Sequence, residues 1–422
     1  MPRFEPFAGL RYANHLDLDQ VVAPPYDVVL PSERAQLADR NPANAIRVEL
    51  PEPDEQAGLD RYQAAAHLLA QWQRDGTLVR DPAPAFYVYR MTPPEGQPTT
   101  GVIGIVGIDD ADTGSVLPHE HTLPKPKTDR LDLLRATGTN LSPIWGLSLT
   151  EGLTATLSPT TGRPPTASAT DDDGVLHQLW VVDDPATIDE VRRAVEASPL
   201  VVADGHHRYE TARTYLAEER ASSSGRASTL GAASNSGASG LMALVVELSD
   251  EQLAVGPVHR ALSGLPEGFD LPAAFSPWFE VTAAGPSTDE AIAALGQTQT
   301  RALVTPDGIW RLTPRAGTTE EAGADLDSAM VGLVLDDLPP HDLTVCHTWS
   351  EALAALRSGQ AQALVLVQPA RVSQIAEWAH ARRRMPPKTT YFFPKPRTGM
   401  VFRDLRPAEH DGRTPAKPEV EP

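Results

Sequence analysis

The chain has 422 residues, of which 41% are hydrophobic, and a formal net charge of −20 from 56 acidic and 36 basic residues. This hydrophobic content can fill a packed core, which excludes a disordered chain. The negative charge argues against a general nucleic-acid surface, because such surfaces need a basic footprint. It leaves room for a small basic pocket that binds a phosphorylated metabolite.

Cellular location is indicated by what the sequence lacks. Cys346 is the single cysteine, which excludes a disulfide framework and a cysteine-based zinc finger. The first residues, Met1 to Glu5, lack the apolar core of a signal peptide. No run approaches the roughly 18 apolar residues of a membrane span. We therefore expect a soluble cytoplasmic protein without a membrane partner, and the oligomeric state stays open.

In the N-terminal part, the two prolines of the 21–26 segment predict extended backbone, and Pro31 is expected to open a helix. Helical spacing predicts a helix over 59–75 that stops at Gly76. Further along, apolar runs and helical periodicity predict strands at 86–90, 101–108, 145–149, 179–182, 200–204, 242–246 and 363–367, and helices at 187–197, from Tyr209, 287–295 and 350–356.

These elements predict a mixed α/β fold, with the order of the strands left open. We expect an N-terminal α/β region over 1–220 and a C-terminal α/β region over 241–405 that completes the same domain. A flexible Ser/Gly/Ala insertion is expected at 221–240, and a charged, proline-bearing disordered tail at 406–422.

The most informative stretch is the end of the strand expected before Asp204, where a glycine and then a helix follow. Such a turn leaves backbone N–H groups unpaired at the positive end of the helix dipole, which favours an anion. The stretch adds charge-assisted donors suited to phosphate, and we interpret it as a phosphate-handling loop formed by Asp204, Gly205, His206, His207 and Arg208. The alternative is an ordinary turn whose histidines satisfy local backbone groups.

A second cluster follows Pro118, where prolines exclude regular structure, and Thr128 is expected to cap a helix. Its basic residues suit phosphate oxygens, and Glu120 suits a general base or a Mg²⁺ ligand. The polar residues of this cluster are His119, Glu120, His121, Lys125, Lys127 and Arg130. The alternatives are a zinc site at the two histidines and a solvated charged loop.

Two further segments carry candidate ligand-binding residues. Asn140 and Ser142 either hydrogen-bond a ligand or cap and turn the chain. The proline-stiffened run from Met385 to Pro396 carries Lys388 and Lys395, and its alternative is a strand packed at a sheet edge.

Taken together, these segments resemble the domain-of-unknown-function family numbered 1015, a bacterial and archaeal family without an assigned activity. The resemblance extends from Phe4 to about Phe402 and is carried, in order, by the segments 24–27 with Tyr26 and Asp27, 119–130, 140–143, 204–212, His259-Arg260 and 387–395.

The loop from Asp204 to Arg208 is also similar to the phosphate-binding box of the superfamily that contains ParB partition proteins, sulfiredoxin and free-serine kinases. The resemblance implies that the box holds nucleotide phosphates and that a glutamate assists Mg²⁺ or the acceptor hydroxyl. Cys346 lies far from the box, which disfavours sulfiredoxin chemistry, and the chain lacks the basic surface of a ParB protein. Of the three branches of this superfamily, the resemblance therefore favours the small-molecule kinases.

We therefore expect an enzyme, a Mg²⁺- and nucleotide-dependent phosphotransferase that uses ATP or ADP on a small hydroxyl metabolite such as serine. The alternatives are a phosphatase acting on phosphoserine-like esters and a non-catalytic regulator that binds a nucleotide or phosphometabolite. The expected catalytic residues are Glu120, Lys125, His207 and Arg208. The expected phosphate ligands are Asp204, Gly205, His206, His207, Arg208, Lys127, Arg130, Asn140, Ser142, Lys388 and Lys395. Substrate contacts are expected from Tyr26, Asp27, His119 and His121, and Mg²⁺ ligands from Glu120 with Asp204 or Asp27.

Overall fold

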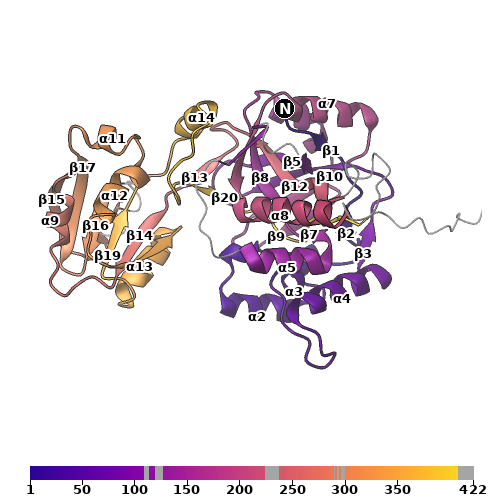
Figure 1. Cartoon of the computed structure of the whole chain (residues 1–422), viewed down its shortest axis with the longest axis horizontal. Coiled ribbons are helices and arrows are strands. Elements are labelled where there is room, and N and C mark those ends of the chain that lie inside the picture. The colour runs from indigo at the N-terminus through magenta and orange to yellow at the C-terminus, as the bar shows by residue number, and fades with distance from the viewer. Residues whose placement is uncertain are drawn as a thin grey trace, which may run out of the picture.

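The computed structural model describes residues 1–108, 114–118, 127–223, 237–288, 290–291, 294–295 and 300–406. Two sheets organise these residues, and Figure 1 shows them as two units side by side, with β13, β20 and α14 between them. The expected mixed α/β fold is confirmed. No helix of the described part is long and apolar enough to cross a membrane.

The larger sheet has nine strands in the order β6-β11-β8-β12-β5-β4-β10-β9, with β1 added against β5. Two neighbouring pairs, β6–β11 and β8–β12, are parallel and the other pairs are antiparallel. The strands are β1 (Phe4–Glu5), β4 (Phe86–Thr92), β5 (Thr99–Gly107), β6 (Val116–Pro118), β8 (Ile144–Ser148), β9 (Ala167–Thr170), β10 (Leu176–Val182), β11 (Leu200–Asp204) and β12 (Gly240–Glu247).

Helices cover one face of this sheet and extend into a second helical layer. Alternate apolar side chains of the strands pack on α6 (Leu153–Thr161), α7 (Pro185–Glu196) and α8 (His206–Ser223). α8 in turn packs on α5 (Lys127–Thr137), which packs on α4 (Arg61–Arg74). The large unit also contains α1 (Leu18–Val21), the 3₁₀ turn η1 (Tyr26–Val28), α2 (Pro31–Arg40), α3 (Ile46–Glu49) and the short strands β2 (Leu10–Tyr12), β3 (Leu78–Arg80), β7 (Thr139–Asn140) and β21 (Arg403–Asp404).

The second sheet has the order β15-β17-β16-β19-β14-β18 and its own apolar core. Its strands are β14 (His259–Ser263), β15 (Phe279–Gly285), β16 (Ala302–Thr305), β17 (Gly308–Pro314), β18 (Asp342–Cys346) and β19 (Ala363–Leu366), and its helices include α9 (Leu271–Phe275), α11 (Thr318–Glu321), α12 (Asp327–Leu335) and α13 (Trp349–Arg357).

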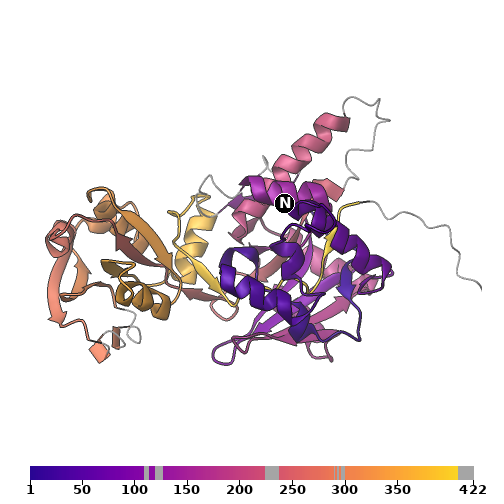
Figure 2. The ribbon, with the colours of Figure 1, turned by 90° about the horizontal axis from the view of Figure 1, so that it is seen from below.

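The chain leaves the large unit after β12 and returns to it near its end. On the way back it passes through α14 (Val372–His380) and then β20 (Tyr391–Phe393), which pairs with β13 (Ala254–Gly256). The view from below in Figure 2 shows the yellow C-terminal segment running back over the large unit. This return brings Lys395 beside Asp204, Arg397 beside Asp171 and Arg403 beside Asn140, which precede them by 191, 226 and 263 positions.

Several sequence expectations need adjustment. The cap expected at Thr128 is wrong, because α5 already begins at Lys127, the first residue after the last proline of that run. The segment from 21 to 26 is only partly extended, since α1 includes Val21 and η1 begins at Tyr26. Residues 237–239 form a 3₁₀ turn with Ala238 buried, whereas 224–236, 407–422 and part of the helix expected at 287–295 lie outside the described residues. The proposed division near 240 stays a prediction, and β12, which follows it, is a central strand of the large sheet.

Candidate functional site

The centre of the site is the junction between β11 and α8. β11 ends at Asp204, Gly205 takes a left-handed φ of 85°, and α8 begins at His206. A Cβ at position 205 would lie 2.9 Å from Ile144 Cγ2 and 3.1 Å from Arg208 Nε. Glycine is therefore required both by the backbone conformation and by the close approach of these side chains. The first amides of α8 form the positive end of a helix dipole at this point.

Asp204 holds two cations at the junction. Arg208 Nη2 donates to Asp204 Oδ2 at 2.9 Å, and Lys395 Nζ pairs with Asp204 Oδ1. Burial alone would raise the pKa of Asp204, but the charges of Lys395 and Arg208 outweigh it and hold the pKa well below its usual range. The carboxylate therefore stays ionised and fixes the two cations relative to each other.

Arg208 is anchored by the segment that joins β7 to β8. Its Nη1 donates to Ser142 Oγ at 3.0 Å and to the Pro143 carbonyl at 2.5 Å. The Ser142 hydroxyl in turn donates to Glu49 Oε1 at 3.2 Å. These bonds set the guanidinium plane, so that the site is preorganised rather than assembled by a flexible side chain.

Glu49, at the end of α3, belongs to the site although the sequence analysis did not single it out. Its side chain is 2% exposed, and Arg130 Nη1 lies 3.9 Å from Glu49 Oε1 while donating to the Glu49 carbonyl at 2.8 Å. Burial raises the pKa of the Glu49 carboxyl, against the opposing charges of Arg130 and Arg208. The one sequence signal was a carboxylate between Val48 and Leu50 in an apolar stretch.

Tyr26 and Asp27 come to the same place through η1. The Arg130 guanidinium lies 4.4 Å from the centre of the Tyr26 ring, a cation–π contact. Burial raises the pKa of Tyr26 to about 12, with the Arg208 charge opposing the shift. Asp27 is exposed, and its charge helps raise the pKa of both Arg208 and Lys395, which are otherwise lowered by burial.

The second unit contributes His347, which the sequence analysis also missed and for which no motif gave a signal. His347 follows β18, and its ring stacks on Tyr391 with centroids 4.3 Å apart and planes 19° apart. The other neighbour of the Tyr391 ring is Lys395, whose Nζ lies 5.3 Å from the ring centre. Burial lowers the pKa of His347, and the charge of Lys388 lowers it further.

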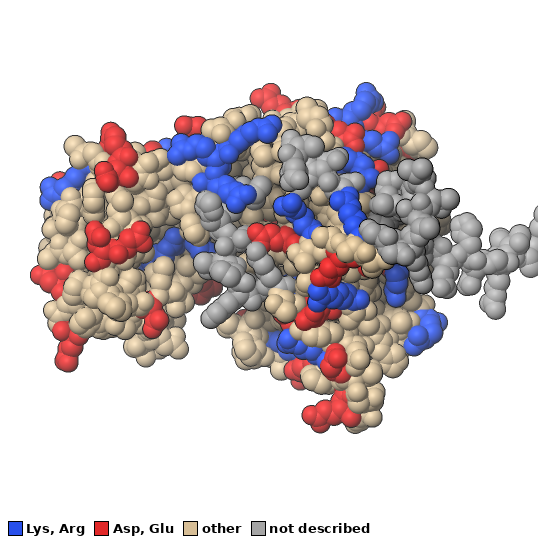
Figure 3. Space-filling view, viewed as in Figure 1, with Lys and Arg blue, Asp and Glu red and all other residues tan. Residues whose placement is uncertain are grey.

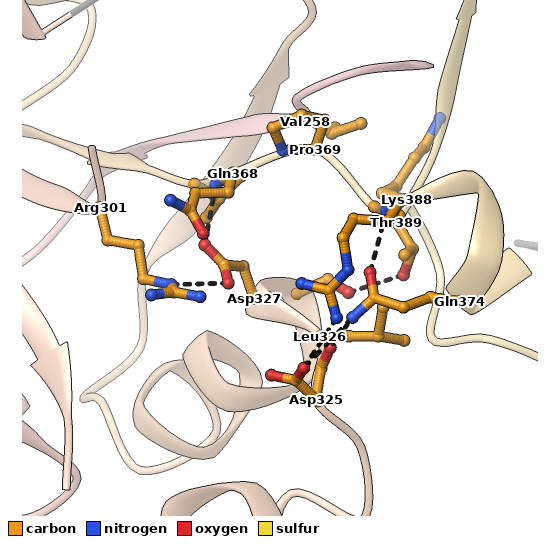
Figure 4. Close-up of a pocket in the computed structure, with 14 residues that line it drawn as sticks. Val258, Arg301, Asp325, Leu326, Asp327, Gln368, Pro369, Gln374, Lys388 and Thr389 are labelled. Atoms are coloured by element: carbon orange, nitrogen blue, oxygen red, sulfur yellow. Dashed lines mark hydrogen bonds and ion pairs between the residues drawn. The ribbon is translucent and has the colours of Figure 1, made fainter. Parts of the chain in front are cut away.

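Two predicted phosphate ligands have structural tasks in the described chain. Asn140 Oδ1 accepts from the Met242 amide at 3.1 Å and from Arg403 Nη1 at 2.9 Å, which ties β7 to β12 and β21. Lys388 has a left-handed φ of 59°, and its carbonyl accepts from Arg260 Nη2 at 2.9 Å. Figure 4 shows Lys388 at the edge of a different cavity, where its side chain extends away from the ion pair between Arg301 and Asp327.

The remaining predicted residues divide into two groups. His206 and His207 are half-buried in the first turn of α8, beside the junction. His119, Glu120, His121 and Lys125 lie outside the described residues, as does the side chain of Lys127. The described residues on either side are β6, whose Pro118 pairs with Val202 of β11, and α5.

The described residues bring no three His, Cys, Asp or Glu side chains together as a metal site. Both oxygens of Asp204 are engaged by cations, so this carboxylate does not fit the role of a Mg²⁺ ligand in the conformation seen here. On the face seen in Figure 3, acidic and basic side chains are interspersed, and the cations of the junction are mostly buried.

The fold and the site together define a mixed α/β protein with a preorganised cluster of charged side chains at a strand–glycine–helix junction. The chain belongs to the family described as Protein of unknown function (DUF1015), whose model matches residues 4–329. This match includes the junction and ends before Lys388 and Lys395, which the sequence resemblance had included. No curated protein matches the chain.

Solved structures show a loose overall similarity. A mutant free serine kinase in complex with AMP is 13% identical, with 71% of this chain and 92% of that chain covered at a TM-score of 0.37. A conserved hypothetical protein from Pyrococcus furiosus is 13% identical over 74% and 96% of the two chains, also at 0.37. SbnI with a C-terminal truncation from Staphylococcus aureus is 13% identical over 71% and 86%, at 0.35. Similarity at this level identifies neither a ligand nor a reaction for this chain.

Proposed function

We propose that the protein is a nucleotide-dependent phosphotransferase that acts on a small hydroxyl-bearing metabolite. The observation that carries this proposal is the convergence at the start of α8 of two largely buried cations, Arg208 and Lys395, from segments far apart in the sequence. Tyr26, Asp27 and Ser142 surround the same point. A cluster of fixed cations at the positive end of the α8 dipole is suited to the oxygens of a nucleotide phosphate.

Phosphoryl transfer needs mainly positioning and neutralisation of charge, and the junction supplies both. In the proposed reaction the phosphoryl group moves from the nucleotide to the acceptor oxygen, and the acceptor hydroxyl releases its proton to a base. Arg208 and Lys395 stabilise the phosphate charge, with Gly205, His206 and His207 alongside. Glu120 as the base and Lys125 as a further cation remain predictions from the sequence.

Mg²⁺ is also a prediction from the sequence rather than from the site. The described carboxylate nearest the proposed phosphates, Asp204, is already paired with Arg208 and Lys395. We therefore derive no step of the reaction through a metal ion.

The proposal is tested by ³¹P NMR of the purified protein with Mg²⁺ and ATP plus serine, with Mg²⁺ and ADP plus serine, and with Mg²⁺ and phosphoserine alone. Serine is the first acceptor to test because the sequence resemblance implies it. A new phosphomonoester signal with one nucleotide supports the kinase and identifies its donor. Phosphate released from phosphoserine alone favours a phosphatase instead. Nucleotide binding without turnover of any acceptor in a panel of hydroxy compounds overturns the enzyme proposal and favours a regulator.

An Arg208→Lys variant tests whether the guanidinium group takes part in the reaction. It keeps the positive charge but loses the planar fork that contacts Asp204, Ser142 and Pro143. We expect turnover to fall by about 100-fold, as for other losses of a donor to developing charge. Full turnover by this variant would show that phosphoryl transfer does not need the Arg208 guanidinium group.

A further inference from the structure

A cavity lies behind the junction, between α5, α8 and the 139–142 segment. Its apolar walls come from four leucines, Leu133, Leu134, Leu141 and Leu241. Its polar wall includes Glu49, Arg208 and Thr211. Arg208 thus borders two spaces, with its Nη atoms bonded on the junction side as described above.

Three residues that line this cavity each carry a buried polar atom with no hydrogen-bond partner within the described residues: Glu49 Oε2, Arg208 Nε and Thr211 Oγ1. Glu49 is 2% exposed, Thr211 is 4% exposed, and the Arg208 side chain is 10% exposed. Buried polar groups are almost always hydrogen-bonded, because an unmade bond costs the full desolvation of the group. Three such atoms in one cavity point to a ligand.

The three atoms belong to one continuous wall. The Ser142 hydroxyl donates to Glu49 Oε1 at 3.2 Å and accepts from Arg208 Nη1 at 3.0 Å, so Glu49 and Arg208 lie on two sides of a single oxygen. Thr211 follows Arg208 by three residues on α8, which places both side chains on the same face of the helix. A small ligand can therefore contact all three.

We infer that this cavity binds a short-chain aliphatic hydroxy acid. The Arg208 Nε–H and the Thr211 hydroxyl donate to the carboxylate of the ligand, Glu49 Oε2 accepts from its hydroxyl, and the leucines contact its carbon chain. The role of this ligand as the phosphoryl acceptor rests on the proposed function, whereas its binding does not. Arg130 Nη1 already lies 3.9 Å from Glu49 Oε1, and this cation disfavours a second positive charge beside Glu49, which favours a hydroxy acid over an amino acid.

The test is isothermal titration calorimetry of the full chain with 3-hydroxybutyrate, with butyrate and with L-serine, and separately with ADP and ATP. We expect 3-hydroxybutyrate to bind at least about tenfold more tightly than butyrate, because loss of the hydroxyl leaves Glu49 Oε2 unpaired. L-Serine is expected to bind more weakly than 3-hydroxybutyrate. Equal binding of butyrate and 3-hydroxybutyrate, tighter binding of L-serine, or no binding of 3-hydroxybutyrate overturns the inference.

A pair of variants on α8 locates the ligand. Thr211→Val preserves the shape of the side chain and removes one donor, so we expect about fivefold weaker binding of 3-hydroxybutyrate and unchanged binding of nucleotide. Thr214→Val changes an exposed threonine of the same helix and is expected to alter neither. Unchanged 3-hydroxybutyrate binding by Thr211→Val overturns the assigned cavity. If the hydroxy acid binds but neither nucleotide does, the proposed function fails and this inference stands. If a nucleotide binds but the hydroxy acid does not, this inference fails and the proposed function stands.

Discussion

Two clusters of buried charge lie in the large unit, and a single segment supplies a cation to each. Lys395 pairs with Asp204 in the candidate site, and Arg397, two residues later, pairs with Asp171. Both carboxyl groups have a pKa held well below the usual range by their cationic and hydrogen-bonding partners, although burial opposes the shift in each. Burial and shifted pKa therefore do not distinguish the two clusters.

The difference is that the polar groups of the Asp171 cluster are hydrogen-bonded to one another. His177 Nε2 bonds to Asp171 Oδ2 at 2.8 Å, His177 Nδ1 bonds to the Tyr89 hydroxyl at 2.7 Å, and the Arg397 amide donates to the same hydroxyl at 3.1 Å. Around Asp204, by contrast, the neighbouring Glu49 and Arg208 keep polar atoms without partners in the described chain. A satisfied network stabilises the fold, whereas an incompletely satisfied one beside a cavity is suited to a ligand.

The largest expected effects come from removing the arginine of each cluster. Arg208→Ala and Arg397→Ala each leave a buried carboxylate without one of its cations, so each is expected to lower the free energy of unfolding by about 3–5 kcal/mol. Only Arg208→Ala is expected to abolish binding of ADP or ATP. Urea unfolding and calorimetry of the folded fractions measure the two quantities.

Arg74→Ala, at an exposed position of α4, is the control and should change neither quantity. If Arg208→Ala is too unstable to study, Arg208→Lys retains the charge and reports on binding alone. The proposed difference between the two clusters is contradicted if both variants lose nucleotide binding, or if Arg208→Ala still binds nucleotide.

A smaller effect is expected from Gly205→Ala. The left-handed φ of 85° and the 2.9 Å approach of a Cβ to Ile144 both oppose alanine, and together are expected to cost about 2 kcal/mol of stability. Gly162→Ala is the matched control, because φ there is −75° and the nearest atoms to a Cβ lie 3.7 Å away. Equal stability of the two variants in urea unfolding would show that the junction tolerates a side chain.

The regular elements around the junction were predictable because their signals are local. The apolar run of β11 followed by Gly205 predicted a strand, a turn and a helix, and β4 and β5 lie where the apolar runs at 86–90 and 101–108 predicted strands. The residues from 204 to 208 were identified for the same reason.

The partners within the site were much less predictable. Glu49 and His347 stand in sequence contexts without a motif, and their importance arises only when α3 and β18 are brought to the junction by the tertiary fold. Lys395 was identified as a cation, but its partner, Asp204, is 191 residues away in the sequence. Contacts of this kind depend on strand order, which periodicity does not encode.

The Asp171 cluster also predicts a dependence of stability on pH. Burial lowers the pKa of His177, with hydrogen bonding to Asp171 opposing the shift, so the folded state holds this ring neutral. The unfolded chain takes up a proton near pH 6.5, so this stabilisation is fully present above about pH 6.5 and is lost as the pH falls towards the folded pKa. His177→Gln should therefore lose stability at neutral pH and show a flatter profile below it in urea unfolding. An unchanged slope would contradict this, and His67→Gln, at an exposed position of α4, is the control.

The smallest effect on stability, within about 0.5 kcal/mol, is expected from His347→Gln, since the ring is only partly buried. This variant shows whether the second unit belongs to the site.

The pKa of His347 is lowered by burial and by the charge of Lys388, and a bound polyanion near Lys395 would reverse the electrostatic part of that shift. NMR titration of the His347 ring should therefore show a higher pKa with ADP than without it, and His347→Gln should weaken ADP binding by about threefold. A His347 pKa that ADP leaves unchanged would confine the site to the large unit, with Tyr391 and its stacked histidine serving only to hold the returning segment in place.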